Sequence, residues 1–82
     1  PIPLPTPTPA TVEATILVAE DDPALLRHMV ELLKDRYRVL PAANGAAALA
    51  IAREELPDLL VTDLDMPQMN GMELTREFLA LQ

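Results

Sequence analysis

The sequence predicts an α/β fold in which three parallel strands alternate with three helices. Two short apolar runs, residues 16–19 and 59–62, are typical of strands that are buried on both faces. Elsewhere apolar residues recur with helical spacing, and Pro or Gly stands near the junctions between these patterns. The resulting order, βαβαβα, implies a parallel sheet with right-handed crossover connections.

The chain of 82 residues has room for one small domain. Proline occupies every odd position from 1 to 9, a pattern that favours extended polyproline II geometry. We therefore expect residues 1–14 to form a disordered, proline-rich linker, with a docking site for a proline-recognising module as the alternative. The folded domain is expected to occupy residues 15–82.

The composition excludes several classes of function. The formal net charge of −7 argues against nucleic acid as a partner of this segment, because phosphate binding requires basic patches. The chain has no cysteine, which excludes disulfides and thiol chemistry. No apolar run approaches the roughly 20 residues that span a membrane, so we expect no membrane partner. The sequence lacks a signal-peptide pattern, and we expect a cytoplasmic location. The missing initiator Met indicates part of a longer chain.

The first helix is predicted to follow Asp22. This residue can cap the helix, and Pro23 suits the first helical position because its missing N–H costs no hydrogen bond there. The helix is expected to end near Arg36. Its apolar stripe has the spacing i, i+3, i+4 and i+7 and consists of Leu26, Met29, Val30 and Leu33.

The second strand is predicted at Tyr37–Leu40. It is expected at an edge of the sheet, because Pro41 at its far end cannot donate to a sheet ladder. Asn44-Gly45 predicts a turn, and a second helix is expected at Ala46–Leu56. The buried face of this helix should consist of Ala48, Ile51, Ala52 and Leu56.

The third strand is expected at Leu59–Leu64, after Pro57 and Asp58 end the second helix. A loop at residues 66–71 follows, and Gly71 is the expected site of positive φ. Three methionines are expected to pack beneath this loop: Met66, Met69 and Met72. The last helix should begin near Met72 and bury Leu74, Phe78 and Leu81.

Acidic residues follow the first and third predicted strands directly: Glu20, Asp21 and Asp22 after the first, and Asp63 and Asp65 after the third. Because open α/β sheets bind ligands at the carboxyl ends of their strands, these acids are expected to converge in one crevice. Clustered carboxylates repel one another, so the cluster needs a cation, shared protons or solvent. Asp22 is assigned to the helix cap. For Glu20 and Asp21 we favour metal binding over the alternative that they only interact favourably with the dipole at the amino terminus of the first helix.

Two segments of the chain resemble the receiver domain of two-component response regulators. They are ILVAEDD at residues 16–22 and PDLLVTDLDMPQMNGMEL at residues 57–74. The resemblance covers nearly all of residues 15–82. It implies a flavodoxin-like, doubly wound parallel sheet, of which this chain would hold the amino-terminal βαβαβα portion with strand order 2-1-3.

The resemblance also implies a role in phosphorelay signalling. Asp63 would be the phosphoacceptor, and the donor would be a sensor histidine kinase or a histidine phosphotransfer protein. Mg²⁺ would be held by Asp21, by Glu20 mostly through a bound water, by Asp63 and by the backbone carbonyl of Asp65. Mg²⁺ prefers oxygen ligands and itself bridges to phosphoryl oxygens, and a carboxylate can accept a phosphoryl group as an aspartyl-phosphate. Such a domain is a phosphoacceptor and binding module rather than a turnover enzyme.

The chain departs from the family pattern by stopping within the third helix. Receiver domains continue through two further strands, which carry a hydroxyl residue and a lysine that contact the phosphoryl group. Neither residue has a counterpart here, so we expect impaired phosphorylation. The third strand should also expose a hydrophobic edge, which is a template for pairing with another chain. Homo-oligomerisation through that edge is the expected consequence.

Two alternative functions remain open. The chain could be a non-signalling fragment that self-associates and whose acids are relics. Asp63-Leu64-Asp65 also matches the D-x-D motif of haloacid-dehalogenase-type phosphatases. Those enzymes place the motif on their first strand and follow it with Thr or Val, whereas here it follows the third strand and precedes Met66-Pro67.

Overall fold

The computed structural model describes residues 14–66 and 69–82. The linker expected at residues 1–14 therefore lies outside the described residues, apart from Ala14. The first strand begins at Thr15, one residue before the apolar run predicted to form it. Among the described residues, no helix is both long and apolar enough to cross a membrane.

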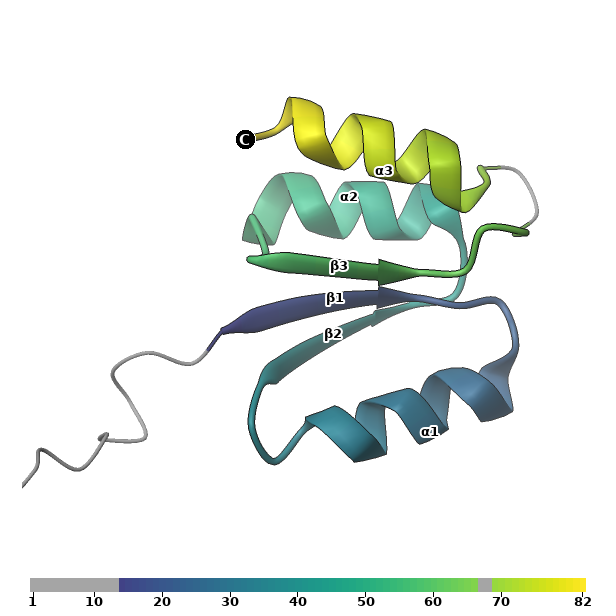
Figure 1. The fold of residues 1–82 in the computed structure, drawn as a ribbon, viewed down its shortest axis with the longest axis vertical. Coiled ribbons are helices and arrows are strands. Elements are labelled where there is room, and N and C mark those ends of the chain that lie inside the picture. The colour runs from purple at the N-terminus through teal and green to yellow at the C-terminus, as the bar shows by residue number, and fades with distance from the viewer. Residues whose placement is uncertain (1–13, 67–68) are drawn as a thin grey trace, which may run out of the picture.

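Three parallel strands and three helices make up the described domain. The elements are β1 (Thr15–Ala19), α1 (Pro23–Leu33), β2 (Arg38–Ala42), α2 (Gly45–Glu55), β3 (Leu59–Thr62) and α3 (Gly71–Ala80). The strand order is β2-β1-β3, with β1 in the centre. One face of the sheet is covered by α1 and the other by α2 and α3 (Figure 1). The predicted βαβαβα order and 2-1-3 sheet are confirmed.

The core lies between the sheet and the α2–α3 layer. Leu17 and Ala19 of β1 belong to it, and Leu74 and Phe78 reach it from α3. All four residues at 16–19 are buried, because β1 is paired on both sides and covered on both faces. The expected burial of Leu74 and Phe78 is confirmed, and Leu81 packs against the same cluster.

Helix α1 begins as predicted and ends earlier. The Asp22 Oδ1 atom accepts hydrogen bonds from the backbone N–H groups of Ala24 at 3.0 Å and Leu25 at 3.4 Å, which caps the helix. The α-helix ends at Leu33 rather than near Arg36, because the Leu33 carbonyl accepts from the N–H groups of both Arg36 and Tyr37 and closes a tight turn. The four stripe residues are only half-buried, since α1 alone covers its face of the sheet.

Strand β2 is an edge strand, as Pro41 predicts, although it runs to Ala42 and includes the proline. Helix α2 starts at Gly45, one residue earlier than expected, and Asn44 Oδ1 accepts from the N–H of Ala47 at 2.7 Å. The expected burial of Leu56 is wrong. This residue has φ 46° and ends the helix, so its side chain leaves the buried face and is exposed.

Inside α2, the expected burial of Ala48 and Ala52 is confirmed, and Ile51 packs against the core while partly exposed. Leu49, which was not predicted to be buried, fills part of the core. The reason is that α3 lies beside α2 and covers a wider arc of that helix than the sheet alone would (Figure 1).

The expected positive φ at Gly71 is wrong. Neither glycine of the chain has a positive φ, and both stand at the first position of a helix. A Cβ on Gly71 would overlap the carbonyl oxygen of Asp63, and one on Gly45 would overlap the carbonyl oxygen of Met69. Both positions therefore require glycine because two backbone segments approach each other closely. Strand β3 ends at Thr62, two residues before the expected Leu64.

Two of the three loop methionines pack as expected. Met66 is buried and Met69 packs against the core while partly exposed. Met72 is exposed instead, because it lies on a flank of α3 that no described element covers.

We predict that Gly71→Ala destabilises the domain, although alanine favours helices. The added methyl group would meet backbone atoms of Asp63 and Leu64, which cannot move without displacing the end of β3. Forced overlap of this kind costs about 1–3 kcal/mol. Urea denaturation of the parent and the variant measures the decrease in the free energy of unfolding. The matched exchange Ala50→Gly, at an exposed position of α2, should cost only about 0.5–1 kcal/mol. A Gly71→Ala variant at least as stable as the parent would contradict the prediction.

Candidate functional site

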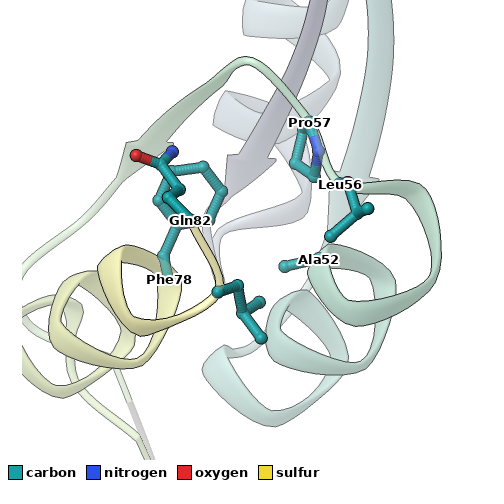
Figure 2. Close-up of a pocket in the computed structure, with 6 residues that line it drawn as sticks. Ala52, Leu56, Pro57, Phe78 and Gln82 are labelled. Carbon is teal, nitrogen blue, oxygen red and sulfur yellow. The ribbon is translucent and has the colours of Figure 1, made fainter.

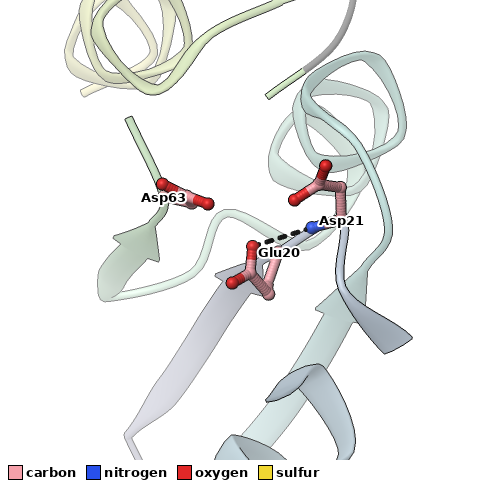
Figure 3. A group of neighbouring side chains, drawn as sticks. All are labelled: Glu20, Asp21 and Asp63. Atoms are coloured by element: carbon pink, nitrogen blue, oxygen red, sulfur yellow. Dashed lines mark hydrogen bonds between the residues drawn. The ribbon is translucent and has the colours of Figure 1, made fainter. Parts of the chain in front are cut away.

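Three carboxylates meet at the carboxyl end of the sheet. Glu20, Asp21 and Asp63 each offer an oxygen that lies within 4.8 Å of the others (Figure 3). Glu20 and Asp21 follow β1, and Asp63 follows β3. The last paired residues of these strands are Ala19 and Thr62, so the chain leaves both strands at the same level. The three side chains that were expected to converge therefore do so.

Glu20 is the buried member of the group, with 5% of its surface exposed. Its backbone N–H donates to the Ala42 carbonyl at 3.0 Å, and its Oε2 atom accepts from the N–H of Asp21 at 2.9 Å. Burial, followed by the proximity of Asp63, raises the pKa of Glu20 above its usual value. A nearby cation would relieve this destabilisation of the charged form.

Asp63 is held in a defined orientation by its own loop. Its backbone N–H donates to the Ala19 carbonyl at 3.1 Å, which anchors the residue to β1. Its Oδ1 atom accepts from the N–H of Asp65 at 3.1 Å. The Thr62 hydroxyl donates to the carbonyl of Asp63 at 2.9 Å. These bonds fix the residue while its carboxylate points toward Glu20 and Asp21 (Figure 3).

The remaining two acids take other positions. Asp22 caps α1, as predicted. Asp65 contributes its backbone N–H to Asp63, and its carboxylate is not part of the three-residue group. A D-x-D phosphatase would use both carboxylates together, so this arrangement does not favour the phosphatase alternative.

The donor set of the cluster suits a hard divalent cation. Carboxylate oxygens are the ligands that Mg²⁺ and Ca²⁺ prefer. Within residues 14–66 and 69–82, the two ion pairs, Lys34–Glu31 at 2.8 Å and Arg38–Glu55 at 3.1 Å, involve no member of the cluster. The negative charge of the three acids is thus not balanced by these pairs, and the cluster could hold a metal ion.

Sequence reasoning missed two features that shape the site. One is the N–H of Asp65, whose bond to Asp63 is typical of an Asx turn and could have been inferred from Asp63-Leu64-Asp65. The other is the absence of a side chain at Gly71, which lets α3 begin directly against the carbonyl of Asp63. The sequence singled out this glycine for a different reason.

An apolar cavity of about 180 Å³ lies at the opposite end of the sheet. It is an open pocket between the last turns of α2 and α3 and the chain that enters β3 (Figure 2). The lining residues are Ala52, Leu56, Pro57, Phe78, Leu81 and Gln82. Because Pro57 precedes β3 and Asp63 follows it, this cavity is separate from the carboxylates.

Comparison with known proteins places the chain among signalling domains. The family model for the response regulator receiver domain matches residues 16–82. Protein PilH of Pseudomonas aeruginosa is 38% identical over 65 residues, which are 78% of this chain and 54% of PilH. The response regulator receiver protein CpdR of Brucella abortus is 47% identical over 62 residues, which are 74% of this chain and 52% of CpdR. Histidine kinase P4 of Formosa agariphila is 44% identical over 62 residues, or 76% of this chain and 4% of the kinase. The chain thus spans about half the length of the shorter relatives.

Solved structures agree with this assignment. A response regulator receiver domain protein from Clostridium thermocellum superposes with a TM-score of 0.80 at 33% identity, covering 84% of this chain and 57% of that one. The receiver domain of the hybrid histidine kinase CckA superposes with a TM-score of 0.77 at 38% identity, covering 83% and 66%. The resemblance of the two sequence segments is confirmed, and the chain belongs to the response regulator receiver domain family.

Proposed function

We propose that this chain acts as the phosphoacceptor of a two-component phosphorelay, with Asp63 receiving the phosphoryl group. The observation that carries the proposal is the position of the Asp63 carboxylate within 4.8 Å of the Glu20 and Asp21 oxygens. Family membership gives this geometry its context, because the matched segment includes all three residues. A sensor histidine kinase or a histidine phosphotransfer protein would be the donor, and the cytoplasmic location expected from the sequence is part of the same proposal.

Mg²⁺ is the proposed cofactor. Asp21, Asp63 and the backbone carbonyl of Asp65 would hold the ion, and Glu20 would act mostly through a bound water. When bound, Mg²⁺ neutralises charge on the acids and on the phosphoryl oxygens. The raised pKa of Glu20 supports a role for a cation here, since a cation stabilises the charged form that burial disfavours.

Asp63 would act as the nucleophile. Its Oδ1 atom is engaged by the N–H of Asp65, which orients the carboxylate. An Asp63 oxygen would form a bond to phosphorus while the phosphorus–nitrogen bond of the donor phosphohistidine breaks, and the electron pair of that bond would return to the imidazole. The product is an aspartyl-phosphate, formed once per chain rather than by turnover of a substrate.

The phosphatase alternative is not favoured, because Asp65 stands apart from the carboxylate group.

We predict that the chain gains one phosphoryl group from acetyl phosphate in the presence of Mg²⁺, and that Asp63→Asn abolishes the gain. The amide keeps the size of the side chain, but it replaces one carboxylate oxygen with NH₂ and removes the negative charge that makes the group a nucleophile. Intact-mass spectrometry measures the labelled fraction. Asp22→Asn is the matched control, because asparagine caps helices as well as aspartate and Asp22 lies outside the cluster. Equal labelling of the two variants, or no Mg²⁺-dependent label on the parent chain, would contradict the assignment of Asp63 as the phosphoacceptor.

We further predict that Glu20→Gln stabilises the metal-free domain at neutral pH. The pKa of Glu20 is higher in the folded state than in the unfolded chain, so the folded state binds the proton of this carboxyl more tightly. Protonated Glu20 therefore favours folding at a pH below the pKa that it has in the unfolded chain. This stabilisation is lost as the pH rises through the pKa of Glu20 in the folded state. Glutamine removes that loss and can still accept the Asp21 N–H bond. Denaturation in EDTA should therefore show a more stable variant at pH 7 and a vanishing difference near pH 4. A variant that is less stable at pH 7 would contradict the prediction.

A further inference from the structure

The backbone carbonyl of Asp63 lies where β3 passes into the loop that precedes α3. The last paired residues of β1 and β3 are Ala19 and Thr62, so this carbonyl lies beyond the strand ladder. Among residues 14–66 and 69–82, its hydrogen-bond donor is the Thr62 hydroxyl, at 2.9 Å. A side chain therefore takes the place of a strand partner at the residue that carries the proposed nucleophile.

Two successive carbonyls of this segment face the start of α3. The Asp63 carbonyl oxygen lies against Gly71, at the position that a Cβ would occupy, and the Leu64 carbonyl accepts from the N–H of Gly71 at 3.2 Å. Van der Waals contact with Gly71 limits how close the Asp63 carbonyl can come but does not give it a direction. A hydrogen bond is directional, so the Thr62 hydroxyl sets the direction of this carbonyl.

The direction of the carbonyl bears on the Asp63 side chain. The peptide group that contains this carbonyl sets the course of the chain to Asp65, whose N–H donates to Asp63 Oδ1 at 3.1 Å. That bond holds the carboxylate, which points toward Glu20 and Asp21 (Figure 3). The Thr62 hydroxyl and the Asp63 carboxylate are thus linked through two hydrogen bonds and a short stretch of backbone.

We propose that Thr62 is a positioning residue for Asp63. Its hydroxyl fixes the peptide group that follows Asp63, and this keeps the N–H of Asp65 in place to orient the carboxylate. A residue that served only strand packing would do so equally well with a methyl group in place of the hydroxyl. The effect on phosphoryl transfer rests on the proposed function, whereas the orientation of the carboxylate does not.

The substitutions Thr62→Val and Thr62→Ser separate positioning from packing. Valine keeps the β-branched shape that suits a strand and lacks the hydroxyl, whereas serine keeps the hydroxyl and loses the branch. In NMR spectra of the metal-free chain, we expect Thr62→Val to shift the Asp63 carbonyl carbon and the Asp65 amide proton upfield, because their hydrogen bonds weaken. Thr62→Ser should restore both signals toward the parent positions. A packing role predicts the reverse order of the two variants.

The rate of phosphoryl transfer is the second measurement. With saturating Mg²⁺, Thr62→Val should take up the phosphoryl group of acetyl phosphate about two- to tenfold more slowly than the parent, the range that one hydrogen bond supplies. Thr62→Ser should remain close to the parent. Thr75→Val is the matched control, since the Thr75 hydroxyl donates to the Gly71 carbonyl, at 2.6 Å, and should match the parent in both measurements.

Circular dichroism checks that all three variants are folded. Parent values for Thr62→Val in either measurement, or a serine variant that does not restore them, would overturn the proposal. If the parent chain itself takes up no phosphoryl group, the assignment of Asp63 as phosphoacceptor fails, and the NMR comparison alone decides whether Thr62 orients the carboxylate.

Discussion

The parallel pairing of β1 with β3 is the constraint on which the site depends. Its register sets Ala19 beside Thr62, so that the next residues of both strands, Glu20 and Asp63, emerge together. A shift of one residue would turn every side chain of β3 to the other face of the sheet and remove Asp63 from its partners. The residues of β1 are buried by neighbours on all sides, and this burial opposes such a shift.

The same geometry collects like charges in a small space and so works against the stability of the metal-free domain. Burial of Glu20 beside Asp63 raises the pKa of Glu20, which means that its charged form is disfavoured there. Hydrogen bonds from backbone N–H groups hold Glu20 and Asp63 in place nonetheless. Gly71 adds to this rigidity by letting α3 start against the carbonyl of Asp63. A bound cation would stabilise an arrangement that the fold has already prepared.

The sequence predicts most of the fold because its signals are local. Short apolar runs identify the strands, Asp22 and Pro23 mark the start of α1, and Pro41 places β2 at an edge. The convergence of the acids follows from strand direction alone. The role of Asp63 as phosphoacceptor and of the acids as ligands stays a prediction.

The features that were not predicted depend on tertiary contacts. Leucine is not a residue type that favours a left-handed conformation, yet Leu56 has φ 46° where α2 ends before Pro57 and β3. The early end of α1 reflects the turn that brings the chain into β2. For Gly71, the sequence indicates that a glycine is required, but only the position of β3 shows that the reason is the close approach of two backbone segments.

Locating a bound cation tests whether Glu20, Asp21 and Asp63 form a metal site. Mn²⁺ binds the oxygen ligands that suit Mg²⁺ and broadens nearby amide signals in an NMR titration of the labelled chain. We expect the amide signals of Glu20, Asp21, Asp63 and Asp65 to broaden first, and excess Mg²⁺ to restore them. Broadening that begins at acids elsewhere, such as Glu73 and Glu77 on α3, and leaves Asp63 sharp would contradict it.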